Sequence, residues 1–150
     1  MQAARIWFQN PTPPLTLSQV KKYLQETGAE VKGTEWRLGN YVVPQLHVTS
    51  PADFVMQLED EVWIIEEAEE FSQRAPAPIS ERLSICDARL SFGEANDENA
   101  ITTDQGIVVA TDWSTFDPEE PQARILLEAL ARMVDGLLED NVSGTWWAPT

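Results

Sequence analysis

Apolar and polar residues follow two different periods along this chain. Stretches in which they alternate, or in which apolar residues run continuously, predict strands, because successive strand side chains point to opposite faces of a sheet. We expect five strands, at residues 4–9, 35–38, 41–48, 83–92 and 106–113. Apolar residues that recur about every 3.6 positions predict amphipathic helices instead. We expect three helices, at residues 16–28, 51–73 and 117–139.

The first and the last predicted helices have clear ends. Thr16 and Gln19 have the spacing of a capping box, and Gly28 marks the end of that helix. The last helix begins at Asp117, which is followed by a proline and two glutamates. Apolar residues then form one broad stripe along it: Ala123, Leu126, Leu127, Leu130, Met133, Val134, Leu137 and Leu138.

The stretch at residues 51–73 fits two different elements. Ser50 supplies a helix cap, and a proline and an acidic residue follow it. A helical period then runs through five apolar residues: Phe54, Leu58, Val62, Ile65 and Ala68. We expect one long helix whose apolar side holds these residues, with Trp63 toward the edge of that side. The alternation at residues 53–58 also fits a strand, but the capping signal favours the helix.

The order of these elements is β-α-β-β-α-β followed by β-α, which is typical of an α+β protein. The first six match the split βαβ arrangement, in which two helices cover one face of an antiparallel sheet. We therefore expect a ferredoxin-like (βαββαβ) antiparallel sheet core with an additional C-terminal strand and long helix. Residues 76–78 and 93–104 are expected to connect elements. No Gly/Ser-rich linker or internal repeat is evident, so residues 1–150 are expected to form a single domain.

Acidic residues outnumber basic ones by 25 to 10, which gives a formal net charge of −15. Residues 38–120 carry this excess, with 18 acidic and three basic residues. Such a charge repels nucleic acids and anionic lipids, so neither is expected as a direct partner. The longest apolar runs are about four residues, against roughly twenty for a membrane-spanning helix. The single cysteine and an N-terminus without a secretory signal pattern indicate a cytoplasmic protein.

Few residues suit catalysis or metal binding. Zinc sites usually take several His and Cys ligands, and the chain has only His47 and Cys86. A serine nucleophile would need His47 as its base, but no Gly-x-Ser-x-Gly elbow occurs, and a pair of Cys86 and His47 has no local signature. No phosphate-binding glycine loop occurs either. The segment at residues 96–99 contains oxygen ligands suited to calcium but lacks the acid spacing of an EF-hand. We expect no metal, no cofactor and no catalytic residue.

The chain has eight acidic residues and no basic one between Asp53 and Glu70. Like charges three or four positions apart weaken a helix, so helix stability does not explain this run. Either the run is a solvated face that keeps the protein soluble, or it attracts a basic partner. Tryptophans among acids suit an interface, although the two near the C-terminus also fit packing on the sheet. The expected partner-binding residues are Glu59, Asp60, Glu61, Trp63, Glu66, Glu67, Glu69, Glu70, Glu94, Asp97, Glu98, Trp146 and Trp147.

Small size, strong acidity, α+β character and the lack of a catalytic motif together resemble the bacterial immunity proteins, which neutralise secreted or contact-delivered toxins. The resemblance implies a non-catalytic protein that binds a cognate toxin domain, often a basic one, and blocks its active site. Two alternatives stay open. One is an inhibitor or adaptor that mimics the charge of nucleic acid. The other is a small ferredoxin-like enzyme or ligand-binding domain, which would need a deep pocket with convergent polar groups.

Overall fold

The computed structural model describes residues 2–38, 40–103 and 106–149, and within these ranges the side chains at 36–38, 41, 96–103 and 106–111 are left out of the description. The helices are α1 (Leu17–Glu26), α2 (Val62–Ser72), α3 (Ala77–Leu83) and α4 (Pro121–Val134). The strands are β1 (Ala4–Phe8), β2 (Glu30–Leu38), β3 (Tyr41–Ser50), β4 (Phe54–Glu59), β5 (Ala88–Thr103), β6 (Gly106–Asp112), β7 (Leu137–Asp140) and β8 (Thr145–Trp147).

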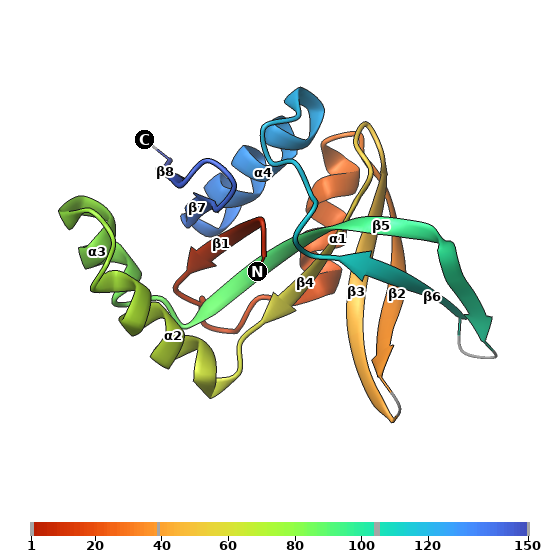
Figure 1. Ribbon diagram of the computed structural model, residues 1–150, viewed down its shortest axis with the longest axis horizontal. Coiled ribbons are helices and arrows are strands. Elements are labelled where there is room, and N and C mark those ends of the chain that lie inside the picture. The colour runs from red at the N-terminus through yellow and green to blue at the C-terminus, as the bar shows by residue number, and fades with distance from the viewer. Residues whose placement is uncertain (1, 39, 104–105, 150) are drawn as a thin grey trace.

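These strands belong to one sheet, in the order β4-β3-β2-β6-β5-β1-β7-β8. Neighbouring strands are antiparallel, apart from the parallel pair β2 and β6. The long strand β5 changes partners along its length: residues 88–93 pair with β1 and β4, and the remainder pairs with β6. Because β6 also pairs with β2, the ladder that starts at β4 returns to β5 and closes on itself (Figure 1).

The α+β class is confirmed, but the strand order is not that of a ferredoxin-like sheet. In a split βαβ unit, the two strands joined by the crossover helix are parallel and have one other strand between them. Here α1 joins β1 to β2, but two strands, β5 and β6, lie between them in the sheet, and β2, β3 and β4 follow one another as a meander. The sheet is also larger than predicted, because β4 and β7 come from segments that were expected to be helical.

Elements with strong local signals form where the sequence predicts them. The capping box of α1 is complete: Thr16 N–H donates to Gln19 Oε1 at 2.9 Å, and Gln19 N–H donates to Thr16 Oγ1 at 3.3 Å. Strands β1 and β6 match their predicted ranges to within a residue. Strands β2 and β3 pair as the predicted hairpin, with Leu38 opposite Tyr41.

The prediction of one helix over residues 51–73 is wrong in its first half, where the chain forms β4. This strand pairs with β3 on one side and β5 on the other, and Phe54, Val55 and Met56 are fully buried. Partners at both edges and burial on both faces stabilise a strand by more than a local cap stabilises a helix. Ser50 therefore ends β3 instead of capping a helix, and α2 begins only at Val62.

Strand β5 also begins and ends later than predicted. The prolines at 76 and 78 open the short helix α3, in which Pro78 occupies the first turn. The strand predicted from residue 83 therefore starts at Ala88. It continues through the segment that was predicted to be a loop, because its second half gains β6 as a partner.

The last helix is shorter than predicted at both ends. It starts after Glu120, whose carboxylate accepts the N–H groups of the first turn. It stops at Val134 because Asp135 has a left-handed φ of 50°. The next residue, Gly136, lies so close to β1 that an added Cβ would be 2.7 Å from the Trp7 carbonyl oxygen. The chain then pairs with β1 as β7, which takes up the last residues of the predicted helix.

The two faces of the sheet are covered by different helices (Figure 1). Side chains at alternate positions of β1, such as Ile6, join α1 and α4 in the larger core. The intervening side chain of Trp7 points the other way and joins Ile64 and Ala68 of α2 and Leu83 of α3 in a smaller core. This second face also holds buried charged residues, among them Arg5, Arg89 and Glu139, and it carries the candidate site.

Candidate functional site

Charged residues occupy strand positions that face α2. Arg5 in β1 lies opposite Ser91 of β5 and Glu139 of β7 in the sheet register. One step along the same face, Arg89 of β5 lies opposite Glu59 of β4 and Trp7 of β1. Period-2 alternation thus places these side chains on one face, while the residues between them join the larger core.

Arg5 and Glu139 form the first half of a buried ion network. Arg5 Nε donates to Glu139 Oε1 at 2.6 Å, and Arg5 Nη2 donates to Glu139 Oε2 at 3.1 Å. The indole N–H of Trp7 donates to the same carboxylate at 3.1 Å. Such two-point pairing is the strong form of an arginine–carboxylate contact, and it satisfies charges that would otherwise be costly to bury.

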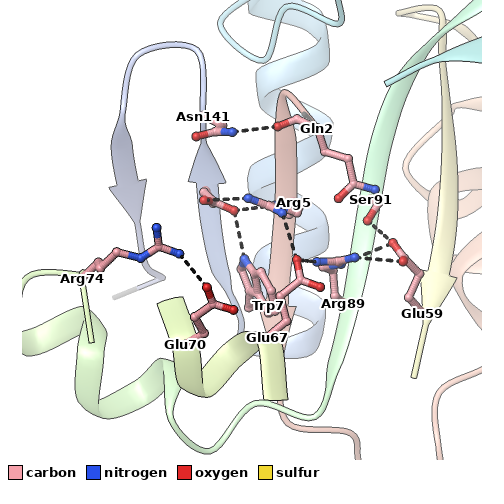
Figure 2. Close-up of polar contacts among 11 residues, drawn as sticks. Gln2, Arg5, Trp7, Glu59, Glu67, Glu70, Arg74, Arg89, Ser91 and Asn141 are labelled. Atoms are coloured by element: carbon pink, nitrogen blue, oxygen red, sulfur yellow. Dashed lines mark hydrogen bonds and ion pairs between the residues drawn. The ribbon is translucent and has the colours of Figure 1, made fainter. Parts of the chain in front are cut away.

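Arg89 forms the second half (Figure 2). Its guanidinium donates to both oxygens of Glu59, at 3.3 and 2.9 Å, and to Glu67 of α2 at 2.9 Å. The Ser91 hydroxyl also donates to Glu59. Burial disfavours the charged guanidinium, but the contacts with Glu59 and Glu67 outweigh burial and raise the pKa of Arg89. Glu67 completes the network through Arg5 Nη1 at 3.5 Å.

Aromatic rings enclose the two guanidinium groups. Arg5 Cζ lies 4.8 Å from the centre of the Phe71 ring of α2. Arg89 Cζ lies 4.9 Å from the Trp7 ring and 5.1 Å from the Trp63 ring. These distances are in the range of cation–π attraction. Trp63 therefore covers Arg89 from the α2 side, and the network fixes α2 against the sheet.

The outer face of α2 presents large apolar residues to solvent. Val62 is 75% exposed, Ile65 is 47% exposed and Trp63 is 44% exposed. The prediction that Val62 and Ile65 face the core is wrong, because the helix starts at residue 62 and its buried side is set by Ile64 and Ala68. Trp63 is half exposed, but it borders the side set by Ile64 and Ala68, where it lies over Arg89, and not the side that the sequence predicts.

The structure divides the predicted partner-binding residues of this region into two groups. Glu59 and Glu67 belong to the buried network. The others are exposed and surround the apolar residues of α2: Asp60, Glu61, Glu66, Glu69 and Glu70. We call the exposed acids, together with Val62, Trp63 and Ile65, the α2 surface. Glu70 forms an i,i+4 ion pair with Arg74 at 3.5 Å.

The other predicted partner-binding residues lie elsewhere. Trp146 packs against the smaller core, on the side of the sheet where α2 lies, whereas Trp147 packs against the larger core and has Arg132 5.2 Å from its ring centre. Glu94 is exposed and accepts a hydrogen bond from Thr115 Oγ1 at 2.8 Å. The side chains of Asp97 and Glu98, and with them the possible calcium ligands, lie outside the described part of the chain.

His47 and Cys86 are engaged with different partners. His47 Nε2 lies 2.7 Å from Asp53 Oδ1. Cys86 Sγ donates to the Arg82 carbonyl at 3.4 Å, and burial raises its pKa to about 12. Across the described residues, no group of three or more His, Cys, Asp and Glu side chains is arranged to hold a metal ion. In the same ranges, no helix has the length and apolar character needed to cross a membrane.

Sequence reasoning did not identify the ion network. The signal in the sequence was weak: Arg5 interrupts an otherwise apolar stretch in β1, but Arg89 occupies a polar position of an alternating stretch in β5. A charged residue at a buried position needs a partner, but a sequence does not say which acid supplies it. No protein-family model matches the chain, and neither curated proteins nor solved structures give a significant match.

Proposed function

We propose that this protein is a non-catalytic protein-binding protein, and specifically an immunity protein that binds a cognate bacterial toxin domain and blocks its active site. The observation that carries the proposal is the α2 surface. Three large apolar side chains, Val62, Trp63 and Ile65, lie exposed within the first two turns of one helix. Exposed acids surround them on the same helix and in the turn before it.

This arrangement has the composition of a protein interface. Interfaces concentrate binding energy in a few apolar or aromatic residues near their centre, and a polar rim excludes water from them. Here Trp63 and Ile65 provide the centre and the acids provide the rim. A solvated face needs no exposed apolar centre, so solubility alone accounts for the acids but not for these residues.

The acids favour a basic partner. Complementary charge accelerates encounter and excludes partners of the same sign. Toxin domains that act on nucleic acid are commonly basic, and an acidic protein placed over such an active site competes directly with the substrate. The buried ion network supports this role, because a helix held rigidly in place loses little conformational freedom on binding.

The test is a binding measurement with the toxin domain encoded by the open reading frame directly upstream. We expect a one-to-one complex at micromolar concentration and low salt, and we expect Ile65→Ala and the double reversal Glu66→Lys/Glu69→Lys each to weaken it by about tenfold or more. The double reversal Glu26→Lys/Glu81→Lys, at exposed residues of α1 and α3, changes the net charge by the same amount and should bind like the wild type. Failure of the wild-type protein to form a complex would refute the proposal.

The same measurement, repeated with unrelated basic proteins in competition with DNA, separates this function from mimicry of nucleic acid. A mimic should compete with DNA for several unrelated basic proteins with similar affinities, whereas an immunity protein should bind one partner far more tightly. Binding by a mimic should also depend little on Ile65, because a mimic relies on its charge. The exposed apolar centre of the α2 surface supports toxin binding over mimicry of nucleic acid.

A further inference from the structure

Strands β3 and β4 separate beside the α2 surface. Their ladder contains three residue pairs and ends where Leu46 lies opposite Met56. Pro44, which has no N–H to donate to a ladder, lies two residues beyond that point. Beyond the end of this ladder, residues of β3 and β4 line two hollows that share Val43, Leu58 and Glu61.

The smaller hollow has a volume of about 160 Å³. Sites for drug-sized ligands are about 300–1,000 Å³, so this one suits a single side-chain head group. Besides Val43 and Leu58, its lining residues are two tryptophans, two glutamates and two glutamines: Trp63 and Trp113, Glu59 and Glu61, and Gln2 and Gln57. The larger hollow, of about 370 Å³, continues from it past Leu17, Val42 and Pro44 and is more apolar.

Of the two glutamates that line the smaller hollow, Glu59 has a basic partner and Glu61 has none among the described residues. The Glu59 carboxylate is paired with Arg89, which lies behind it and also holds Glu67. Glu61 is exposed and makes no ion pair or hydrogen bond through its side chain among the described residues. Asp60 lines the adjoining hollow and adds a second exposed carboxylate. The hollow therefore has an excess of negative charge next to two aromatic rings.

We propose that this hollow binds the guanidinium group of an arginine side chain from the partner protein, and this inference rests on the proposed function. Aromatic rings attract cations, and a guanidinium does so while also pairing with a carboxylate through two hydrogen bonds. Trp63 and Trp113 supply the rings and Glu61 supplies the carboxylate. The larger hollow takes an apolar neighbour of that arginine. The arginine site thus extends the α2 surface at Trp63, which belongs to both.

A small probe tests the site on the protein alone. N-acetyl-arginine amide is titrated at low salt while the indole N–H signals of the six tryptophans are followed by NMR. We expect saturable shifts at Trp63 and Trp113 in the millimolar range. N-acetyl-citrulline amide, which has the same shape without the charge, should give none. N-acetyl-lysine amide should bind about threefold or more weakly, because an ammonium group cannot pair with a carboxylate through two parallel hydrogen bonds.

Variants connect the shifts to named side chains. Glu61→Gln should weaken binding of the arginine probe about three- to tenfold, and Trp113→Leu should do so at least as strongly. Glu81→Gln removes the same charge far from the hollow in sequence and should leave the titration unchanged. Shifts that do not saturate, an equal response to citrulline or lysine, or full binding by Trp113→Leu would overturn the inference. The probe titration contains no toxin, so its failure would not refute the proposal that the protein binds a toxin. Likewise, failure to bind the toxin would not change the result of the probe titration.

Discussion

Replacement of Arg89 by methionine tests whether the buried ion network holds α2 on the sheet. Arg89 is almost fully buried and makes three hydrogen bonds, two to Glu59 and one to Glu67, at 2.9–3.3 Å. Methionine is unbranched and keeps much of the apolar packing, but it removes the charge. Two carboxylates then lose their main partner within the protein, which costs more than the lost contact area alone.

The size of the effect follows from the burial of the partners. Removing one member of a buried ion pair typically lowers the free energy of unfolding by about 3–5 kcal/mol. We expect a value near the lower end, about 3 kcal/mol, because Glu67 is 27% exposed and keeps Arg5 as a partner. With a urea slope of about 2 kcal/mol/M, the unfolding midpoint should fall by about 1.5 M. Urea unfolding followed by tryptophan fluorescence and by circular dichroism measures this directly.

Arg74→Met is the matched control. Arg74 and Glu70 form an ion pair on the outside of α2, where their side chains are 65% and 70% exposed. Its loss should cost less than about 1 kcal/mol. Adding Glu59→Gln to Arg89→Met should restore part of the stability, because it removes the charge left without a partner. A midpoint shift for Arg89→Met no larger than that for Arg74→Met would refute the reasoning.

Three further predictions follow from single side chains. Burial opposes ionisation of Asp140, but the hydrogen bonds that its carboxylate accepts from the Val142 and Ser143 N–H groups, at 3.0 and 3.1 Å, help to lower its pKa. Its charge therefore stabilises the fold above the unfolded pKa of about 3.9, and this stability is lost as the pH falls through the lower folded pKa. Asp140→Asn should be less stable than the wild type at about pH 7, and the difference in stability should disappear by about pH 2. Because burial raises the pKa of Cys86 to about 12, a disulfide reagent at about pH 8 should modify it orders of magnitude more slowly in the native protein than in urea. Glu67→Lys should lower the unfolding midpoint strongly, whereas Glu66→Lys, one position away and exposed, should leave it nearly unchanged in the same urea assay.

Local patterns predicted those elements whose signals agree with their surroundings. The capping box at Thr16 and the hairpin of β2 and β3 depend on neighbouring residues, and both are confirmed. The failures occur where strands distant in the sequence decide the outcome. Residues 54–58 acquire β3 and β5 as partners, and the residues after Gly136 acquire β1. A helical pattern and a cap carry no information about such pairings.

The candidate site was predictable in the same partial way. The acidic run and Trp63 pointed to the segment that holds the α2 surface, since six of the eight acids lie in α2 or in the turn before it, whereas Asp53 precedes β4 and Glu59 lies in it. Which acids point inward could not be read from the run itself. Glu67 pairs with Arg5, 62 positions away, and with Arg89, 22 positions away. Only the register of β1 and β5 brings those two arginines to one place.

The acids of this region therefore divide between two roles that a count of charges does not separate. Buried ion networks contribute little stability beyond what apolar packing at the same positions would give. Three carboxylates on two guanidiniums are thus an inefficient way to fasten a helix if stability were the only requirement. The network does fix the rotation of α2, because Glu67 and Phe71 contact the arginines only when they face the sheet. That rotation is what turns Val62 and Ile65 outward among the remaining acids, so the buried charges are best understood as positioning the exposed ones.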